Sequence, residues 1–271
     1  MGVLDKLDMT QRLDRDEYEK RLLAGQRRLQ QLRLTIGGQL GTGKVGPSIV
    51  VVVEGPDASG KGGAIKAMVS HLDPRHYNVK NYAAPTREEK YHHFLWRFWR
   101  DLPTMGGMSV FDRSWYGRVL VERIEGFCTK AEWRRAFRTI SEFEESLCTE
   151  SSIIVKLYMH ISDEEQMRRF HSRAEDPLKR WKLTEEDWRN REKNREYEAA
   201  AEEMFLRTSH KLAPWDVIAA EQKRYARVAA VDTLVLRLEE GMRRWGMEVP
   251  SIAEVAIQKA ADKAADKAAE K

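Results

Sequence analysis

The stretch Val50-Val-Val-Val-Glu-Gly-Pro-Asp-Ala-Ser-Gly-Lys-Gly-Gly63 decides how the rest of the chain is interpreted. Four consecutive valines are typical of a buried strand, and a glycine-rich turn ending in Gly-Lys follows before a helix-like segment. In such a loop, backbone N–H groups and the positive end of the next helix surround a phosphate, and Lys61 adds a positive charge. The residues expected to line the phosphate are Gly55, Ala58, Ser59, Gly60, Gly62 and Gly63.

This loop departs from the common G-x-x-x-x-G-K-[ST] pattern at two positions. Gly62 stands where a Ser or Thr hydroxyl normally binds Mg²⁺, and an acidic residue, Asp57, lies inside the loop. A glycine turn between a strand and a helix can also be purely structural. The length of this loop, its lysine and its strand–turn–helix context favour a phosphate site whose metal ion is held in an unusual way.

The composition sets the class of the protein. The chain has 271 residues, 33% of them charged, and a net charge of +4, which suits one large α/β domain and excludes a general nucleic-acid coat. Cys128 and Cys148 show neither metal-ligand spacing nor a secreted disulfide framework, so a reduced intracellular compartment is expected. No apolar run is long enough for a membrane span, and residues 1–6 lack the apolar region of a signal peptide. We therefore expect a soluble, cytoplasmic protein with neither membrane nor nucleic-acid partners.

The ends of the chain differ from its middle. Residues Thr10–Leu34 have apolar positions at helical spacing and predict a leading helix against the domain, followed by a flexible linker, Gly37–Gly46. We divide the chain into residues 1–46, a kinase-like domain at 47–248, and a tail at 249–271. Within the tail, Ala256–Lys271 is an Ala/Lys/Asp/Glu repeat to which no function is assigned.

Strand and helix patterns alternate along residues 47–248. The predicted strands are Ser48–Glu54, Tyr77–Tyr82, Met108–Asp112, Ile153–Met159 and Trp215–Ala219. The predicted helices lie near Ala64–Leu72, Glu88–Arg100, Ala131–Leu147, Glu164–Ala174 and Glu185–Thr208. This alternation predicts an α/β fold with a central parallel five-stranded sheet and helices on both of its faces.

A second acidic residue follows a predicted strand. Met108–Asp112 ends in Asp112, and ligands in such sheets gather at the carboxyl ends of the strands. Asp112 and Asp57 are therefore the predicted pair of oxygen ligands for Mg²⁺. The alternative is that Asp112 only caps the segment that follows it.

Three arginines follow Asp112 closely. A guanidinium matches the oxygens of a phosphate, and Arg113 is the one expected to be functional. For Arg118 and Arg123, phosphate binding and pairing with neighbouring glutamates remain equal alternatives. Trp115 and Tyr116 are interpreted as packing residues rather than as a surface for base stacking.

A basic cluster spans approximately residues 168–195. It contains Arg168, Arg169, Arg173, Lys179, Arg180, Lys182, Arg189 and Arg191, with the turn-forming Asp176-Pro177 inside. Interspersed acids allow a solvated helix with charge pairs. The favoured interpretation is a helical lid, in which two basic helices joined by a proline-containing loop cover the phosphates.

The aromatic segment Tyr91–Trp99 contains two adjacent histidines. Adjacent residues point to different faces of a helix, so His92 and His93 make a poor pair of metal ligands. The aromatic residues recur at helical spacing, and we assign them to the core.

Together these clusters resemble the family-2 polyphosphate kinases over approximately residues 33–228. The motifs that carry the resemblance are Gly55-Pro-Asp-Ala-Ser-Gly-Lys-Gly-Gly63, Ala84-Pro-Thr86, Phe111-Asp-Arg-Ser-Trp-Tyr-Gly-Arg118, Val121-Glu-Arg-Ile-Glu-Gly-Phe127, Glu175-Asp-Pro-Leu-Lys-Arg-Trp-Lys182 and Ala213-Pro-Trp-Asp-Val-Ile218. The resemblance implies a P-loop kinase fold that transfers phosphoryl groups reversibly between inorganic polyphosphate and nucleotides with Mg²⁺, or Mn²⁺ as the alternative ion.

The resemblance also implies roles for individual residues. Asp57 and Asp112 match the two essential acids, which organise Mg²⁺ and the acceptor phosphate, and Arg113 matches the arginine that holds this phosphate. Lys61 matches the loop lysine, and Lys66 matches a basic position facing the polyphosphate path. The other residues implied to bind phosphate or nucleotide are Thr86, Arg118, Glu122, Arg169, Arg173, Lys179 and Lys182.

The sequences Ser114–Phe127 and Thr184–Lys193 look most like the branch that phosphorylates nucleoside monophosphates, so AMP is the expected acceptor. Members of that branch commonly carry two fused kinase-like domains, whereas this sequence contains one. The alternatives are phosphorylation of nucleoside diphosphates, an ATP-dependent small-molecule kinase, and a non-enzymatic binder of polyphosphate or nucleic acid. A homodimer or homotetramer is expected from the family alone.

Overall fold

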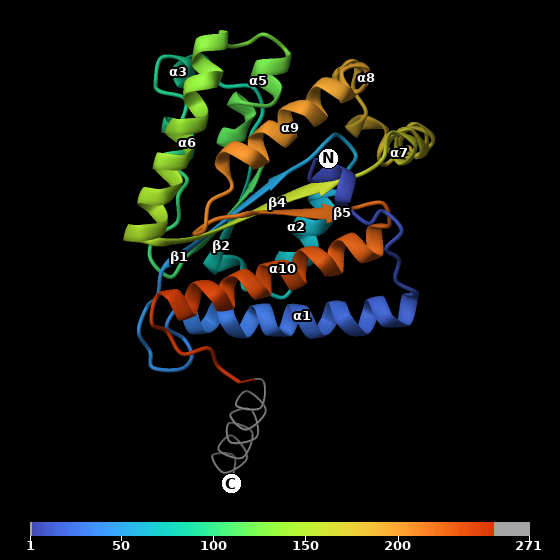
Figure 1. The fold of residues 1–271 in the computed structure, drawn as a ribbon. Helices are drawn as coiled ribbons and strands as arrows, with labels where there is room; N and C mark the ends of the chain where they lie inside the picture. Colours follow the sequence, from blue (N-terminus) through green and yellow to red (C-terminus); the bar gives the residue numbers. More distant parts are fainter. Residues whose placement is uncertain (1, 252–271) are drawn as a thin grey trace.

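The computed structural model describes residues 2–251 and contains one five-stranded sheet (Figure 1). All strand pairs are parallel, and the order across the sheet is β2-β3-β1-β4-β5. The strands are β1 (Ser48–Glu54), β2 (Tyr77–Asn81), β3 (Met108–Asp112), β4 (Ser152–His160) and β5 (Trp215–Ala219). The predicted fold class is confirmed. Only two strands differ from their predicted bounds: β2 is one residue shorter at its end, and β4 is one residue longer at each end.

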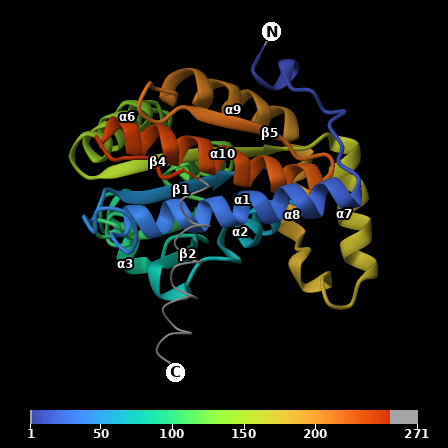
Figure 2. The same cartoon turned by 90° about the horizontal axis from the view of Figure 1, so that it is seen from below.

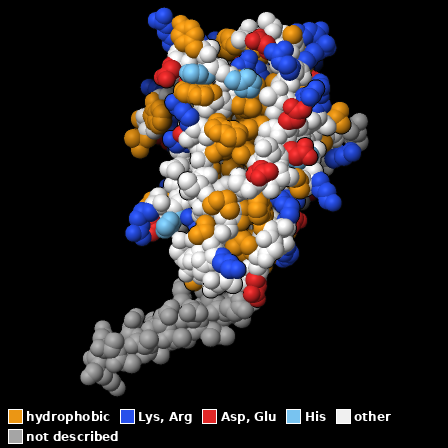
Figure 3. All heavy atoms as spheres, turned by 90° about the vertical axis from the view of Figure 1, so that its left-hand side faces the viewer, with side chains coloured by type: hydrophobic (Ala, Val, Ile, Leu, Met, Phe, Trp, Pro, Cys, Tyr) orange, Lys and Arg blue, Asp and Glu red, His pale blue; other side chains and the backbone are white. Residues whose placement is uncertain are grey.

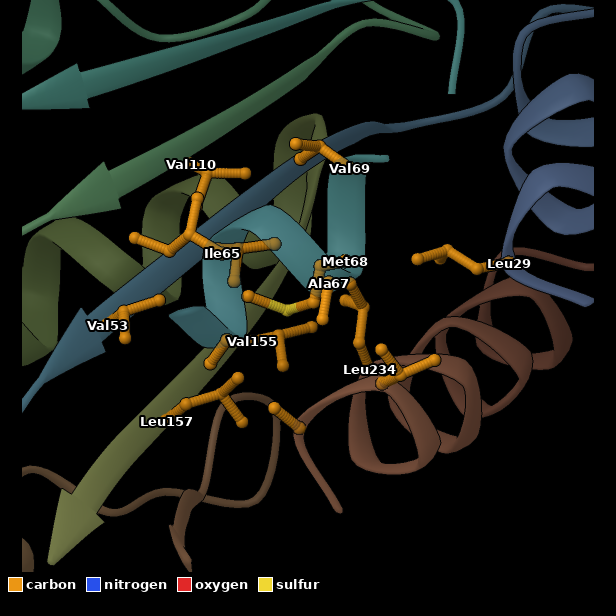
Figure 4. Packing of buried hydrophobic residues seen from close by; sticks show 14 of the residues in the cluster. Leu29, Val53, Ile65, Ala67, Met68, Val69, Val110, Val155, Leu157 and Leu234 are labelled. Carbon is orange, nitrogen blue, oxygen red and sulfur yellow. The ribbon is translucent and has the colours of Figure 1, made fainter. Parts of the chain in front are cut away.

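One face of the sheet is covered by α1 (Arg15–Ile36), α2 (Lys61–Val69) and α10 (Lys223–Arg244). Figure 4 shows Ile65 and Met68 of α2 among valines and a leucine of the strands and leucines of the two long helices. The helices α1 and α10 run side by side in the same direction, joined by the ion pairs Arg21–Asp232 (3.0 Å) and Arg28–Glu239 (2.6 Å). The predicted leading helix therefore belongs to the core, whereas α10 was not predicted.

The other face is covered by α6 (Lys130–Glu150), α9 (Asn194–Thr208), α5 (Val121–Ile124) and the 3₁₀ turn η3 (Trp115–Arg118) (Figure 1). Its core is aromatic, and Phe98 and Phe111 meet Trp115 edge-on. A fully buried ion pair joins Lys156 of β4 to Glu144 of α6 at 2.7 Å.

This buried ion pair is part of a hydrogen-bonded network. Glu144 Oε1 accepts from Trp115 Nε1 at 2.9 Å and from the Tyr116 hydroxyl at 2.7 Å. Lys156 Nζ also donates to the Thr208 carbonyl at 2.7 Å. Trp115 and Tyr116 are fully buried, which confirms their assignment as packing residues.

The aromatic segment differs from its prediction. In place of one helix, the chain forms two turns, α3 (Arg87–Lys90) and α4 (Trp96–Trp99). The break lies where His93 Nδ1 accepts from the backbone N–H of Leu95 at 3.3 Å, and such a local hydrogen bond competes with the helical pattern. Phe98 is buried, but Tyr91 and Trp99 are 75% and 57% exposed, so the assignment of all these aromatic residues to the core was wrong.

The predicted helix Glu185–Thr208 is divided into α8 (Glu185–Glu192) and α9 by Lys193. Lys193 leaves the helical conformation, and its ammonium group contacts Glu125 Oε1 at 3.0 Å. Asn194 Nδ2 donates to Asp163 and Gln166 of α7 (Asp163–Glu175) at 2.6 and 2.9 Å. These contacts to other elements hold the chain at the break.

The segment α7–α8 forms a hairpin, which we call the basic hairpin (residues 163–192). A loop with Pro177 and the short turn η4 (Arg180–Lys182) joins its helices, as the sequence predicted. Figure 2 shows the hairpin projecting from the body of the molecule beside the start of α1.

The remaining segments are short. The 3₁₀ turns η1 (Leu4–Lys6) and η2 (Pro74–His76) lie near the N-terminus and before β2. The predicted linker folds back on α1, since Gly46 N–H donates to the Ile36 carbonyl at 2.7 Å. Of the predicted tail, residues 250 and 251 accept hydrogen bonds from Arg28 and Gln31, and Ala256–Lys271 lies outside the described residues. No helix within residues 2–251 has both the length and the apolar character that crossing a bilayer requires.

Candidate active site

The loop between β1 and α2 has the geometry of a phosphate cradle. Gly55 has a φ of 140°, and a Cβ on it would stand 2.4 Å from the Met159 carbonyl oxygen, so only glycine fits. Gly60, with a φ of 105°, is the N-cap of α2, and the first N–H groups of this helix have no acceptors one helical turn earlier. A Cβ at Gly62 would meet no atom within 4 Å, so the start of α2 is open to a ligand.

Lys61 lies across this loop. Its Nζ donates to the carbonyls of Gly55 and Pro56 at 2.8 and 3.0 Å. Burial lowers the pKa of the ammonium group, which the nearby charge of Asp57 opposes. The predicted loop lysine thus lies in contact with the loop backbone.

The Asp57 carboxylate of the phosphate loop contacts both of the other predicted clusters, the arginines after β3 and the basic hairpin. Its Oδ1 accepts from Arg113 Nη2 at 2.9 Å, and its Oδ2 accepts from Asn190 Nδ2 of α8 at 2.9 Å. Burial opposes ionisation, but Lys61, Arg113 and the hydrogen bond from Asn190 lower the pKa of this carboxyl below 3.8, its ordinary value. The structure therefore joins the phosphate loop, the end of β3 and the basic hairpin at one charged group.

Asp112 lies at the carboxyl end of β3, beside β1, with Val53 as its register partner. The turn after it is capped by Ser114, whose Oγ accepts from Tyr116 N–H at 3.2 Å, so Asp112 is not the cap. Arg113 has a φ of 65°, a backbone strain that costs about 1–3 kcal/mol in a residue other than glycine. Its N–H donates to the Val53 carbonyl at 3.2 Å, which helps hold this conformation.

Asp57 and Asp112 are the candidate metal ligands. Within residues 2–251, no group of three or more His, Cys, Asp or Glu side chains is arranged to hold a metal ion. Mg²⁺ is commonly bound by one or two carboxylates together with substrate phosphates and waters. The hard oxygen donors at the ends of two adjacent strands fit that mode of binding.

Glu54 was missed by the sequence reasoning. It is 5% exposed and accepts a hydrogen bond from Ser114 Oγ at 2.8 Å, directly beneath the loop. Burial raises the pKa of this carboxyl. A charged residue at the end of an otherwise apolar strand was the available signal.

A pocket opens beside the loop, between the ends of β1 and β4 and the helices α7–α9. Its polar groups include Asp57, Arg113 and Asn190, and its apolar wall includes Leu120 and Val121. The remaining lining residues are Glu54, Gly55, Pro56, Gly117, Tyr158, Gln166, Asn194 and Tyr197. Such a mixture suits a ligand with both a charged and an apolar part.

Arg169 does not occupy the position expected of a lid residue. It is 3% exposed, and all five of its N–H groups find protein acceptors. Nη1 donates to the Ala58 and Ser59 carbonyls, both at 2.9 Å, and Nη2 donates to those of Ala220 and Glu221 at 2.6 and 3.1 Å. Arg169 therefore holds the phosphate loop in place, and its predicted role in binding phosphate stays a prediction.

Three other basic residues predicted to bind phosphate lie in the hairpin: Arg173, Lys179 and Lys182. Lys179 is exposed and pairs with Asp176, and Lys182 lies over the Trp181 ring at 5.1 Å. Arg173 makes no hydrogen bond or ion pair within the described part of the chain. These three residues are placed on the hairpin as predicted, and their phosphate-binding roles stay predictions.

The remaining candidate residues make their contacts away from Asp57. Arg118 pairs with Glu122 at 3.0 Å, and Arg123 pairs with Glu203 at 2.6 Å, which favours charge pairing for both arginines. Thr86 caps α3, where its Oγ1 accepts from Glu89 N–H at 3.2 Å. Lys66 is exposed on α2, one turn beyond Gly63. The structure thus unites only part of the predicted set around Asp57.

Known proteins match this chain closely. The family model for polyphosphate kinase 2 matches residues 12–244. A polyphosphate:AMP phosphotransferase of Pseudomonas aeruginosa is 46% identical over 243 residues, which cover 90% of this chain and 48% of that protein. A GDP-polyphosphate phosphotransferase of the same organism is 39% identical over 81% of this chain and 60% of its own length.

A solved structure is similar over nearly the whole chain. The crystal structure of polyphosphate kinase 2 from Arthrobacter aurescens TC1 superposes with a TM-score of 0.83 at 31% identity and covers 95% of this chain and 92% of that one. This chain spans about half the length of the Pseudomonas AMP phosphotransferase.

Proposed function

This chain belongs to the polyphosphate kinase 2 family, and on that premise we propose that it transfers phosphoryl groups reversibly between inorganic polyphosphate and a nucleotide. The proposed acceptor is AMP, and the product is ADP. The choice of AMP is supported by the higher identity to the AMP phosphotransferase, 46%, than to the GDP phosphotransferase, 39%. Phosphorylation of nucleoside diphosphates is the alternative within the family.

The observation that carries the proposal is the junction at Asp57. Phosphoryl transfer requires in-line positioning of donor and acceptor and neutralisation of charge on the transferred group, with little covalent chemistry from the protein. The Asp57 carboxylate brings together a phosphate loop, an arginine at the end of β3 and the basic hairpin. These are the parts that such a reaction requires.

In this proposal, Asp57 and Asp112 hold Mg²⁺, with Mn²⁺ as the alternative ion. The bound ion would neutralise charge on the phosphate oxygens. Lys61 and the N–H groups at the start of α2 bind the donor phosphates, and Arg113 orients the acceptor phosphate. The pocket beside Leu120 and Val121 takes the base and the ribose of the acceptor.

We propose that the outer part of the basic hairpin, residues 173–192, is a mobile cover, whereas the start of α7 stays fixed to the loop through Arg169. The contacts of this outer part with Asp57 and Glu125 are polar, and such contacts exchange readily with water. Arg173, Lys179 and Lys182 would close on the phosphates and exclude water during transfer.

The direct test is an activity panel. Purified protein is incubated with Mg²⁺, long-chain polyphosphate and AMP, ADP, GMP or GDP, and the products are separated by ion-exchange chromatography. We expect ADP from AMP, and a loss of at least about 100-fold in kcat for Asp57→Asn and Asp112→Asn. No product with any acceptor refutes the proposal.

The panel also separates the alternatives. An ATP-dependent small-molecule kinase would require ATP and leave polyphosphate unused. A non-enzymatic binder would hold polyphosphate in a salt-sensitive manner without product, and Asp57→Asn would leave that binding intact.

We also propose that the protein is cytoplasmic and assembles as a homodimer or homotetramer. Reduced cysteines support the location, because neither Cys128 nor Cys148 is in a disulfide. An exposed apolar face supports assembly. It comprises Tyr91, Trp99 and Met105 in the segment after β2 and Val79 in β2, which is one of the two edge strands. Figure 3 shows hydrophobic side chains gathered on the side of the molecule that carries α3 and α6.

A further inference from the structure

Two buried polar side chains lie next to each other at the carboxyl ends of β1 and β4. Glu54 and Tyr158 are register partners in this parallel pair, so their side chains lie on the same face of the sheet. That face is the one covered by α9, since Tyr158 packs edge-on against Phe205 with ring centroids 5.0 Å apart. Glu54 and Tyr158 are 5% and 4% exposed, and both line the pocket beside the phosphate loop. They therefore form a buried part of the pocket wall.

Each of these side chains has a polar atom to which the protein gives no hydrogen bond. Glu54 Oε1 accepts from Ser114 Oγ at 2.8 Å, whereas Glu54 Oε2 makes no hydrogen bond within residues 2–251. The Tyr158 hydroxyl also makes none within that part of the chain. Buried polar groups are nearly always hydrogen-bonded, because leaving one without a partner costs free energy. These two atoms therefore require an explanation.

The fold satisfies a comparable group one step further along the same strand. Lys156, two residues before Tyr158 on the same face of β4, is fully buried. Its ammonium group donates to the Glu144 carboxylate and to the Thr208 carbonyl, both at 2.7 Å. At Glu54 and Tyr158 the pocket takes the place of such protein partners, so a ligand can supply them.

The amide groups that line the same pocket are already engaged. Gln166 Nε2 donates to the Asp57 carbonyl at 3.0 Å, and Asn190 Nδ2 donates to the Asp57 carboxylate at 2.9 Å. These amide donors are therefore not free to bind a ligand, in contrast to Glu54 Oε2 and the Tyr158 hydroxyl.

We propose that Glu54 and Tyr158 bind the two hydroxyl groups of the acceptor's ribose and so select ribonucleotides over deoxyribonucleotides. The inference rests on the proposed function, which places the acceptor phosphate at Arg113 and the base beside Leu120. The ribose lies between phosphate and base, and Ser114, which directly follows Arg113, holds Glu54. A carboxylate accepts hydrogen bonds from ribose hydroxyls, as in dinucleotide-binding sites, and a tyrosine hydroxyl both donates and accepts.

Three acceptors test this proposal: AMP, 2′-deoxyAMP and 3′-deoxyAMP, each with long-chain polyphosphate and Mg²⁺. A site built to hydrogen-bond a substrate hydroxyl discriminates against an analogue that lacks it, because the polar groups of the site then stay unpaired. We expect the wild-type kcat/KM for AMP to exceed that for each deoxynucleotide by at least about tenfold.

Tyr158→Phe is the main variant, because it removes only the unpartnered hydroxyl. It should bring kcat/KM for AMP to within about threefold of that for one deoxynucleotide, the one that lacks the hydroxyl bound by Tyr158. Thermal unfolding should match or exceed that of wild type, since no hydrogen bond within the protein is lost. Glu54→Gln keeps an oxygen for Ser114 and should lower the preference for AMP over the other deoxynucleotide at least about threefold.

Tyr82→Phe is the matched control. Tyr82 is also buried, but its hydroxyl donates to Asp101 at 2.7 Å, and it does not line this pocket. Its loss should leave the preference for AMP over both deoxynucleotides unchanged.

Failure of the ribose subsite and failure of the proposed function give different results. Equal use of AMP and the deoxynucleotides by wild type, or an equal loss with all three acceptors for Tyr158→Phe, refutes the subsite while leaving the function intact. A change in the preference between AMP and IMP instead would place the two groups at the base and also refute it. If wild type transfers no phosphate to any acceptor, the function fails. Calorimetric titration with AMP then tests the subsite alone, and either no binding or equal affinities of wild type and Tyr158→Phe refutes it.

Discussion

At the scale of single residues, the site is organised by charges placed in strained or buried positions. The Asp57 carboxylate accepts hydrogen bonds from two residues that are distant in the sequence, Arg113 and Asn190, and the backbone of Arg113 has a positive φ. Such strain persists where surrounding contacts fix the conformation, here the hydrogen bond from Arg113 N–H to the Val53 carbonyl. The reacting end of the site is therefore held rigidly before any substrate binds.

The lowered pKa of Asp57 predicts a pH-dependent contribution to stability. The folded protein keeps this carboxylate ionised at pH values where the unfolded chain binds a proton, so its contribution is complete above 3.8 and is lost as the pH falls through the lower folded pKa. We expect Asp57→Asn to lower the free energy of unfolding by about 2 kcal/mol at neutral pH. The deficit should shrink at pH values below 3.8.

Urea unfolding at neutral pH and at a series of acidic values measures this difference. Glu145→Gln, at an exposed position of α6, serves as the control and should cost little at any pH. A deficit for Asp57→Asn that is constant with pH would show that the charge of Asp57 is not its source.

At the scale of elements, adjacent arginines of α7 have opposite roles. Arg169 points inward and joins the phosphate loop to the segment before α10, whereas Arg168 is 66% exposed and contacts only Glu165. We expect Arg169→Met to lower the free energy of unfolding by about 3 kcal/mol or more, because it leaves buried acceptors without donors. Arg168→Met, the matched control, should cost at most about 0.5 kcal/mol.

Chemical denaturation of both variants measures the two costs, and amide hydrogen exchange at residues 55–63 shows whether the loop has loosened. If the two variants were equally stable and Arg169→Met instead raised KM for polyphosphate, the original assignment of Arg169 to the phosphate-binding set would stand.

This pair of arginines also shows where sequence reasoning ends. The strands were predicted because runs such as Val50–Val53 have only one compatible environment, and their carboxyl ends then bring Asp57 and Asp112 to one edge. The neighbouring sequence does not distinguish Arg168 from Arg169, because which side chain of a helix faces the core depends on the elements that pack against that helix. The contact from Asn190 to Asp57 was missed for the same reason: it spans 133 residues.

At the scale of the whole molecule, β2 is one of the two edge strands of the sheet, and an exposed aromatic segment follows it in the chain. If this face joins copies of the chain, a charge at its centre should weaken assembly by leaving a buried charge without a partner. We expect Trp99→Lys to shift the protein towards monomer in sedimentation velocity, with activity per chain tested alongside.

The control for this experiment is Leu206→Lys, on α9, a residue that is 84% exposed and lies outside the proposed face. It should leave the sedimentation profile unchanged. A wild-type protein that sediments as a monomer would remove the basis of the proposed assembly.

The buried ion pair of Lys156 and Glu144 limits how the sequence can change during evolution. Replacing either residue alone leaves an uncompensated buried charge, which costs about 3–5 kcal/mol, a large part of the stability of an ordinary domain. Exchanging both for apolar residues of similar volume is often neutral. Evolution by one substitution at a time therefore cannot replace the ion pair with two apolar residues without passing through a variant that folds poorly. Divergent lineages should keep both charges or have lost both, with few surviving sequences between them.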